Sequence, residues 1–305
     1  IGTARCIAMV LVWNDLAKFD YWHTEDQEGL FLFFLKVVKF LIDLGFKGFR
    51  CDAAYQVPVR FWERLIQETK TLYPDIHFFA ETLGCTPDQT RKTAGAGFDF
   101  IFNSSKWWDF HSFWLMEQYN LTREAVPSVG FPESHDTCRL GEELHGNTDG
   151  LKQRYLFSAL FSAGILMPIG FEFGFRKRFH VVKTTPDDWE KTGIDLTSFI
   201  TNVNKIKGSH AIFQIEAPTE ILHCDNPNIL LMWKGSVEIQ SESLMILNKD
   251  IHTKQHFYTD RLHKYIQSGG VLSDVSPEFR LEHLPEPFSY DLRPGQGIVL
   301  VTESL

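Results

Sequence analysis

The sequence contains little cysteine and no excess of positive charge. Its five cysteines are widely spaced, odd in number and without a Cys-x-x-Cys pair. We therefore expect neither a disulfide scaffold nor a zinc site, and a reducing compartment such as the cytoplasm is the simpler inference. Lys and Arg number 30 against 39 Asp and Glu, giving a net charge of −9 at pH 7. This balance argues against nucleic acid as a partner, because its phosphates require clustered cations.

Long apolar runs are also missing. Residues 6–13 are apolar but lack the basic leader and small-residue cleavage site of a secretory signal. Residues 30–42 are interrupted by Lys36 and Lys39 and are too short to span a bilayer, so no membrane association is expected. What the chain does have is apolar material. Of its 305 residues 44% are hydrophobic, enough for one large domain or for a large and a small one.

The first two thirds of the chain alternate helix-like and strand-like stretches. Helices are predicted over residues 30–44 (stopped by Gly45), 61–72, 87–97, 110–119, 151–163 and 196–206, and strands over residues 46–52, 76–80, 98–102, 126–131 and 165–169. Such units indicate an α/β fold of parallel strands joined by right-handed crossovers. After about Ala217, short strands such as 229–233, 244–247 and 298–301 lie between turn residues. We therefore expect an α/β barrel-type domain over residues 1–216 and a small antiparallel β domain over 217–305.

Three of the predicted strands are followed by a carboxylate. GFKGFRCDAA carries Arg50 and Asp52, HFFAETLG carries Glu81, and SVGFPESHDTCR carries His135 and Asp136. Parallel barrels place their functional residues at the C-terminal ends of strands. Because each charged group follows a run that would otherwise be buried, we interpret the three acids as one catalytic constellation. The structural alternatives are an ion pair at a strand end or an acid that caps a turn.

These acids fit the retaining cleavage of a glycosidic bond. That reaction needs one carboxylate as nucleophile and one carboxylic acid that protonates the leaving oxygen. A further carboxylate can stabilise the positive charge of the transition state. Arg50 shares a strand face with Asp52 and would keep it ionised. Glu81 lies close to Phe78 and Phe79 in the sequence, so desolvation is expected to raise its pKa, as a general acid requires.

FRCDAA, AETLG and ESHDT, in this order and at these spacings, resemble signature segments of the α-amylase superfamily (glycoside hydrolase family 13). The resemblance implies a TIM (β/α)8-barrel fold, with Asp52 as nucleophile, Glu81 as general acid/base and Asp136 as transition-state stabiliser. It further implies that Arg50 and His135 support substrate binding.

Other segments extend this resemblance over nearly the whole chain. SAGILMPIGFEFGF is similar to the eighth barrel strand and its following loop, where Gly170 and Glu172 match a Gly-x-Glu pattern, so Glu172 is a substrate-binding candidate. WNDLAKFDY, with Asp15 and Leu16, resembles the segment ahead of the helix that leads into the fourth strand. PVRFWERLI and LMILNKD look similar to maltosyltransferases that extend α-1,4-glucans.

The chain also departs from the family pattern. The third barrel strand of the family ends in a motif with an Asp and an Asn-His pair, which is missing here, and counting back from Asp52 leaves about fifty residues. The N-terminal barrel strands are therefore expected to be missing. The chain opens on Ile, and an open half-barrel would leave edge strands unpaired and the interior exposed, so a fragment is favoured over a degenerate homologue. Tyr55, a substrate-binding candidate, and Gln56 replace a common Lys-His pair, and Ser134 replaces a common Asn, so the acceptor side stays open.

Several residues have two interpretations. Glu172 either contacts substrate or only orders the turn after Gly170. Trp107 and Trp108 either form a sugar-stacking platform or pack in the core or at the rim. The basic residues 176–178 meet a phosphate or form a solvated loop. Cys51 and His77 are expected to be core neighbours of a strand.

The leading interpretation is an enzyme that acts on α-1,4-glucans or maltooligosaccharides through a covalent glycosyl–Asp52 intermediate. Water or another sugar would resolve this intermediate, so hydrolase and glycosyl or maltosyl transferase remain open. The alternative is a non-catalytic glucan-binding or accessory protein derived from such a barrel. No metal or cofactor is expected, and the sequence does not indicate the oligomeric state.

Overall fold

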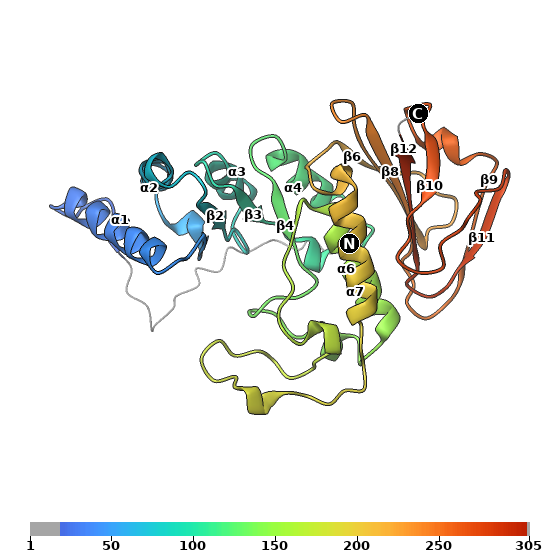
Figure 1. Ribbon diagram of the computed structural model, residues 1–305, viewed down its shortest axis with the longest axis horizontal. Helices are drawn as coiled ribbons and strands as arrows, with labels where there is room; N and C mark the ends of the chain where they lie inside the picture. Colours follow the sequence, from blue (N-terminus) through green and yellow to red (C-terminus); the bar gives the residue numbers. More distant parts are fainter. Residues whose placement is uncertain (1–18, 304–305) are drawn as a thin grey trace, which may run out of the picture. The chain divides into compact units, whose positions relative to one another are not determined.

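The computed structural model describes residues 19–303 of the chain. They divide into two compact units, whose helices and strands Figure 1 shows in chain order. The first unit contains the residues up to Asn103 and the segment Leu121–Pro127, and the second contains Ser104–Asn120 and the residues from Ser128 onward. Within residues 19–303, no helix is long and apolar enough to cross a membrane.

The first unit contains three parallel strands that alternate with helices. Its strands are β1 (Gly48–Cys51), β2 (His77–Ala80) and β3 (Phe100–Phe102), and its helices are α1 (Gln27–Asp43), α2 (Val59–Leu72) and α3 (Pro87–Ala94). β2 pairs with both other strands, with Phe79 opposite Arg50 on one side and Phe100 on the other. The predicted alternation is confirmed here, with boundaries that shift by up to three residues. The three strands end at the same edge of the sheet because they are parallel.

Local signals set the ends of α1. The Asp26 side chain accepts a hydrogen bond from the backbone N–H of Gly29 at 2.6 Å, which caps the N-terminus. At the other end Gly45 has φ +99°, and the N–H groups of Gly45 and Phe46 donate to the carbonyls of Ile42 and Leu41. These paired bonds form a Schellman motif, which favours glycine at this position. The predicted stop at Gly45 is confirmed.

Alternation along the strands decides which side chains are buried in the first unit. Cys51 and Phe78 are 8% and 1% exposed, as expected for core positions. The expectation that His77 lies in the core is wrong, because its side chain is 56% exposed. His77 directly precedes Phe78 in β2, and successive strand residues point to opposite faces.

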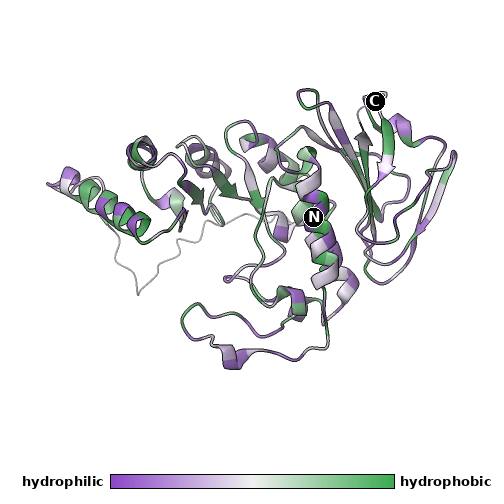
Figure 2. Cartoon of the chain, in the orientation of Figure 1, coloured by the Kyte–Doolittle hydropathy of each residue, from purple (hydrophilic) through white to green (hydrophobic). Residues whose placement is uncertain are grey.

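Helix α1 carries apolar residues on more than one side. Phe31 and Leu35 are buried in the core, whereas Leu32, Phe33 and Phe40 are each more than half exposed. Figure 2 shows hydrophobic positions along the length of this helix. Among the described residues, α1 therefore buries only part of its apolar surface.

The second unit begins with α/β structure. Its parallel strands are β4 (Ser128–Gly130) and β5 (Gly164–Ile165), and its helices are most of α4 (Trp114–Thr122), α5 (Leu140–Glu143), α6 (Thr148–Phe161) and α7 (Thr197–Ser209). β5 is shorter than the predicted strand over residues 165–169. Leu166 still donates to the Gly130 carbonyl, but Pro168 has no N–H to continue a ladder. The four residues of α5 lie between the predicted strand over residues 126–131 and the predicted helix over residues 151–163, where neither a helix nor a strand is predicted.

Helix α6 is the centre of the second unit. It is buried on nearly all sides, as is typical of a helix whose sequence lacks a polar face. Lysine side chains from two other elements satisfy carbonyls at its C-terminal end. The Nζ of Lys207 donates to the carbonyls of Ala159 and Ser162, and the Nζ of Lys234 donates to that of Phe161. Burial lowers the pKa of Lys207 to about 7 and that of Lys234 to about 8.

The remainder of the second unit is antiparallel β structure. A five-stranded sheet has the order β10–β12–β8–β7–β6, and a two-stranded sheet pairs β11 with β9. The strands are β6 (Thr219–Leu222), β7 (Ile229–Ser236), β8 (Ser241–Asn248), β9 (Gln255–Thr259), β10 (Val271–Asp274), β11 (Phe288–Leu292) and β12 (Gly297–Glu303). β7 and β8 are buried along nearly their whole length, so the sheet is covered on both faces at its centre. The predicted antiparallel region is confirmed, and its proposed start at residue 217 stays a prediction.

Short 3-10 helices connect these elements. They are η1 (Ala54–Gln56), η2 (Ser105–Trp107), η3 (Phe171–Phe173), η4 (Pro186–Asp188), η5 (Ala211–Phe213) and η6 (Leu262–Tyr265).

Candidate active site

Arg50 and Asp52 lie at the C-terminal end of β1. The guanidinium Nη1 of Arg50 and Oδ1 of Asp52 are 2.5 Å apart, and the Asp52 side chain is 69% exposed. Ala53 then adopts φ +42°, a left-handed conformation that is costly for a residue with a Cβ atom. This turn ends the strand and leads into η1. The predicted proximity of Arg50 to Asp52 is confirmed.

Glu81 directly follows β2, the neighbouring strand. Its backbone N–H donates to the Cys51 carbonyl at 3.0 Å, and its carbonyl accepts from the N–H of Ala54 at 3.0 Å. Its side chain is turned inward and is held by two backbone amides. Oε2 accepts from the N–H of Ala53 at 2.8 Å, and Oε1 accepts from the N–H of Leu83 at 2.5 Å. Glu81 is thereby fixed against the residue that immediately follows Asp52.

Burial raises the pKa of Glu81 above its ordinary value, and only 7% of this residue is exposed. The two amide donors and the Arg50 charge act in the opposite direction, and the negative charge of Asp52 adds to the increase. Desolvation is the largest of these effects, because it disfavours the carboxylate. The predicted increase in the pKa of Glu81 is confirmed. A buried carboxyl beside an exposed carboxylate matches the division of labour between a general acid and a nucleophile.

Tyr55 lies in η1, shortly after Asp52 in the chain. It is half-buried, and burial is the largest cause of the increase in the pKa of its hydroxyl, to which the charges of Glu81 and Asp52 also contribute. The first unit therefore brings together Arg50, Asp52, Tyr55 and Glu81.

His135 and Asp136 follow β4 in the second unit. Nε2 of His135 is 3.1 Å from Oδ2 of Asp136, and the Asp136 side chain is 67% exposed. The preceding residue organises the turn. The Ser134 hydroxyl accepts from the N–H of Asp136, and the Ser134 N–H donates to the Thr137 hydroxyl. Ser134 thus replaces a common Asn with a hydroxyl that supports the turn.

A buried ion pair in the same loop was not recognised from the sequence. Glu133 and Arg139 are 1% and 3% exposed, and Nη1 of Arg139 donates to Oε1 of Glu133 at 2.6 Å. The other oxygen of Glu133 accepts from the N–H of Leu140, and Nη2 of Arg139 donates to the Ile169 carbonyl at 2.9 Å. The pair therefore ties the loop of His135 to the segment after β5. Its sequence signal is a Glu and an Arg six positions apart around the His-Asp motif.

Glu172 lies in η3 and orders a turn. Its Oε2 accepts from the N–H of Gly170 at 2.9 Å, and its carbonyl accepts from the N–H of Leu196. Gly170 has φ +93°, and a Cβ there would lie 2.2 Å from the Phe175 ring. These contacts agree with the interpretation that Glu172 orders the turn, and substrate contact by Glu172 stays a prediction.

The two candidate tryptophans differ in environment. Trp107 is 51% exposed and packs edge-to-face on Phe131, whereas Trp108 is 2% exposed in the core. Only Trp107 therefore keeps an accessible surface.

The basic residues 176–178 are partly neutralised by acids. Lys177 pairs with Asp188, and the N–H groups of Arg176 and Lys177 donate to the carboxylate of Glu190. Arg178 instead donates through Nη2 to the Asp136 carbonyl at 3.4 Å. Lys177 and Arg178 line a cavity of about 270 Å³, together with Phe175 and Trp189.

The second unit thus contains His135, Asp136 and Glu172, whereas Arg50, Asp52, Tyr55 and Glu81 belong to the first. Asp15 and Leu16 lie outside the described residues. No group of three or more His, Cys, Asp or Glu side chains within residues 19–303 is arranged to hold a metal ion. The cysteines in this part of the chain are free thiols.

Comparison with known proteins gives matches in both sequence and structure, although no protein-family model matches the chain. The alpha-1,4-glucan:maltose-1-phosphate maltosyltransferase of Burkholderia pseudomallei is 27% identical over 176 residues, covering 55% of this chain and 16% of that protein. The protein of the same name from Methylacidiphilum infernorum is 26% identical over 290 residues, covering 87% of this chain and 42% of that protein. The crystal structure of an alpha-amylase from Lactobacillus plantarum matches with a TM-score of 0.72 at 16% identity, covering 95% of this chain and 70% of that one.

The chain resembles the α-amylase superfamily in both comparisons, as its motifs predict. Its fold is of the TIM (β/α)8-barrel type, here a partial barrel with a C-terminal antiparallel β region, as predicted. In sequence it is similar to the alpha-1,4-glucan:maltose-1-phosphate maltosyltransferases. The chain spans less than half the length of these curated relatives.

Proposed function

We propose that this chain carries the catalytic acids of a retaining α-glucan-active enzyme. Asp52 is the nucleophile, Glu81 the general acid/base and Asp136 the transition-state stabiliser. The observation that best supports the proposal is the environment of Glu81. Its buried carboxyl has a raised pKa and is held by the amide of the residue next to an exposed, arginine-paired Asp52. The assignment of Asp136 rests on the resemblance of its motif.

In the proposed reaction, an oxygen of Asp52 attacks the anomeric carbon while the bond from that carbon to the leaving oxygen breaks. Glu81 donates its proton to the leaving oxygen, which produces a glycosyl ester of Asp52 and a Glu81 carboxylate. In the second step Glu81 takes a proton from an acceptor hydroxyl, whose oxygen attacks the anomeric carbon and releases Asp52. Each step inverts the configuration of the anomeric carbon, so the two steps together retain it.

The supporting residues act through charge and position. Arg50 donates a hydrogen bond to the Asp52 carboxylate and so orients this group for attack. His135, only about a third exposed and in contact with Asp136, can donate a hydrogen bond to a sugar hydroxyl and orient the stabilising carboxylate. Tyr55 follows the nucleophile and is assigned to substrate binding.

We further propose transfer of a maltosyl group from maltose 1-phosphate to an α-1,4-glucan as the specific reaction. The similarity to maltosyltransferases supports this choice of donor and acceptor. Arg178 adds local support, because its guanidinium contacts the backbone of Asp136 and is a suitable partner for a phosphate.

The test is to incubate the full-length protein with maltose 1-phosphate and maltooligosaccharides and to analyse the products. Chain extension with release of phosphate supports maltosyl transfer, whereas reducing sugar alone supports hydrolysis. A Glu81→Gln variant should lose on the order of 10²–10⁴-fold in turnover. Glu63→Gln, an exposed acid on α2, is the matched control and should leave turnover unchanged. Unchanged turnover in Glu81→Gln would refute the assigned roles, and glucan binding without turnover by the wild type would favour the non-catalytic alternative.

A further inference from the structure

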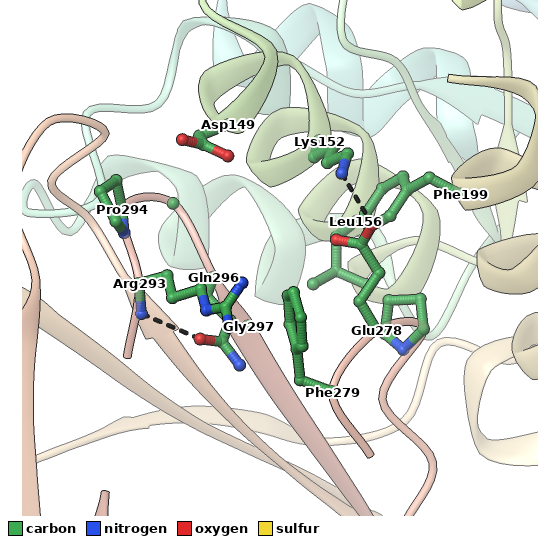
Figure 3. Close-up of a pocket in the computed structure, with 12 residues that line it drawn as sticks. Asp149, Lys152, Leu156, Phe199, Glu278, Phe279, Arg293, Pro294, Gln296 and Gly297 are labelled. Carbon is green, nitrogen blue, oxygen red and sulfur yellow. Dashed lines mark hydrogen bonds and ion pairs between the residues drawn. The ribbon is translucent and has the colours of Figure 1, made fainter. Parts of the chain in front are cut away.

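A second cavity lies within the second unit. Its volume is about 170 Å³, and α6, α7 and two loops of the antiparallel region, at residues 277–279 and 293–297, line it (Figure 3). None of the residues assigned to catalysis or substrate binding lines this cavity.

The cavity combines aromatic surface with balanced charge. Nζ of Lys152 is 2.7 Å from Oε1 of Glu278, and the guanidinium of Arg293 lies 3.8 Å from the centre of the Phe279 ring. Asp149 is the second acid, so two cations face two carboxylates, and Figure 3 shows these side chains around the opening. The cavity therefore has no net charge to select a phosphate or an amine.

Its walls are built by close packing and not by loose loops. A Cβ on Gly295 would lie 2.6 Å from the Asp149 carbonyl oxygen, and a Cβ on Gly297 would lie 2.5 Å from the Leu156 side chain. At Gly295, which has φ +62° and meets backbone atoms of α6, only glycine allows this close approach. Such contact holds the polar groups in position before a ligand arrives, which reduces the entropy cost of binding.

The ring of Phe279 is 47% exposed at the rim, and the buried Phe199 forms part of the wall. Ligand sites typically combine such apolar surface with a few polar groups that orient the ligand. The donors are the cations of Lys152 and Arg293, and the acceptors are the carboxylates of Asp149 and Glu278. A neutral ring that carries several hydroxyls can use both kinds of group at once, because each hydroxyl donates and accepts. The volume suits a single pyranose ring.

We propose that this cavity binds one glucosyl unit of an α-glucan. The choice of glucan among neutral sugars rests on the proposed function. A site of this kind would hold a glucan chain on the protein independently of its cleavage or extension.

The experiment measures maltoheptaose binding by calorimetry, using the full-length protein with Glu81→Gln to stop turnover. Phe279→Ala in this background should weaken binding on the order of tenfold, because an apolar contact face is lost. Lys152→Met is the second variant, since it removes a donor and keeps the side-chain volume. Tyr258→Ala, an exposed aromatic on β9 outside the cavity, is the matched control and should bind as before. Thermal unfolding checks that each variant is folded.

Weaker binding in both cavity variants and not in the control supports the proposal. Unchanged maltoheptaose binding in a folded Phe279→Ala or Lys152→Met variant overturns it, as does wild-type turnover of glucan without any binding at this cavity. The outcome is separable from that of the proposed function. Loss of binding in the cavity variants of a protein that never turns over glucan would retain the cavity site and reject the catalytic roles. In an otherwise wild-type protein, Phe279→Ala should leave turnover of maltose 1-phosphate unchanged.

Discussion

Replacing Arg139 by Met should destabilise the second unit by breaking its buried ion pair. The Arg139 guanidinium donates to the Glu133 carboxylate and to the carbonyls of Ile169 and Lys177, and it faces the Phe179 ring at 5.6 Å. Methionine fills much of the same volume but can donate no hydrogen bond. Glu133, 1% exposed, would then keep only the Leu140 N–H as its hydrogen-bond donor among the contacts described above.

The expected cost is about 3–5 kcal/mol in the free energy of unfolding at neutral pH, which is the usual consequence of leaving one partner of a buried pair uncompensated. This figure is the cost of removing one partner and leaving the other charge buried and unpaired. The net stabilisation by the intact pair is smaller, because desolvation offsets much of the attraction between the charges. The double variant Glu133→Gln/Arg139→Met should therefore be less destabilised than the sum of the two single variants. A coupling energy between residues that share hydrogen bonds is expected to be about 0.5–3 kcal/mol.

The loss of unfolding free energy in Arg139→Met should also depend on pH. Burial already raises the pKa of Glu133, and Arg139 acts to lower it. Removing Arg139 raises this pKa further, so the folded variant binds a proton more tightly than the unfolded chain. Between the unfolded and the folded pKa values, the free energy of unfolding then falls as pH rises, by up to about 1.4 kcal/mol per pH unit. The loss of unfolding free energy in Arg139→Met should therefore be smallest below the pKa of Glu133 in the unfolded chain. It should reach its full size above the pKa of Glu133 in the folded variant.

Urea unfolding of the wild type and the variants from pH 4.5 to pH 8, followed by tryptophan fluorescence, measures these quantities. Arg91→Met is the control, because Arg91 pairs with Asp88 on the exposed surface of α3 and should contribute little. If Arg139→Met costs no more than Arg91→Met, or if the Glu133 and Arg139 effects add, the assigned coupling of the pair is refuted.

Three further predictions concern other sites. The acid form of Glu81 should be lost as pH rises through its raised pKa, so kcat/KM should fall on the alkaline side of a pH–rate profile. Arg50→Leu removes a charge that lowers this pKa, so the alkaline fall in kcat/KM should move to higher pH. Burial lowers the pKa of Lys207 to about 7, so only the unfolded chain binds its proton between there and 10.5, and wild-type stability should rise with pH in that window. In Lys207→Met this contribution should vanish, and at pH 6 urea unfolding should show a loss of roughly 1–3 kcal/mol, because three carbonyls lose their donor. Gly141→Ala should destabilise by roughly 1–3 kcal/mol, since its Cβ would lie 2.6 Å from two backbone carbonyl oxygens, whereas Gly208→Ala in open space on α7 should be neutral or stabilising in thermal unfolding.

The sequence by itself determined the types of the main helices and strands, because their signals are local. The helical stop at Gly45 depends on neighbours within a few positions. The motifs around Asp52, Glu81 and Asp136 indicated the resemblance to the α-amylase superfamily for the same reason, since each is a short contiguous segment. The pairing of Arg50 with Asp52 followed from a spacing of two along one strand.

The tertiary structure alone decided the burial and the long-range partners of several other side chains. Trp107 and Trp108 are neighbours in the sequence, yet one is exposed and the other lies in the core. Lys207 and Lys234 were not recognised as partners of α6, because they reach its carbonyls from 45 and 73 positions away. The cavity lined by Lys152 and Phe279 joins distant segments, since its ion pair connects Lys152 with Glu278, 126 positions further along the chain. Burial and long-range pairing depend on how the whole chain packs, and no local pattern carries that information.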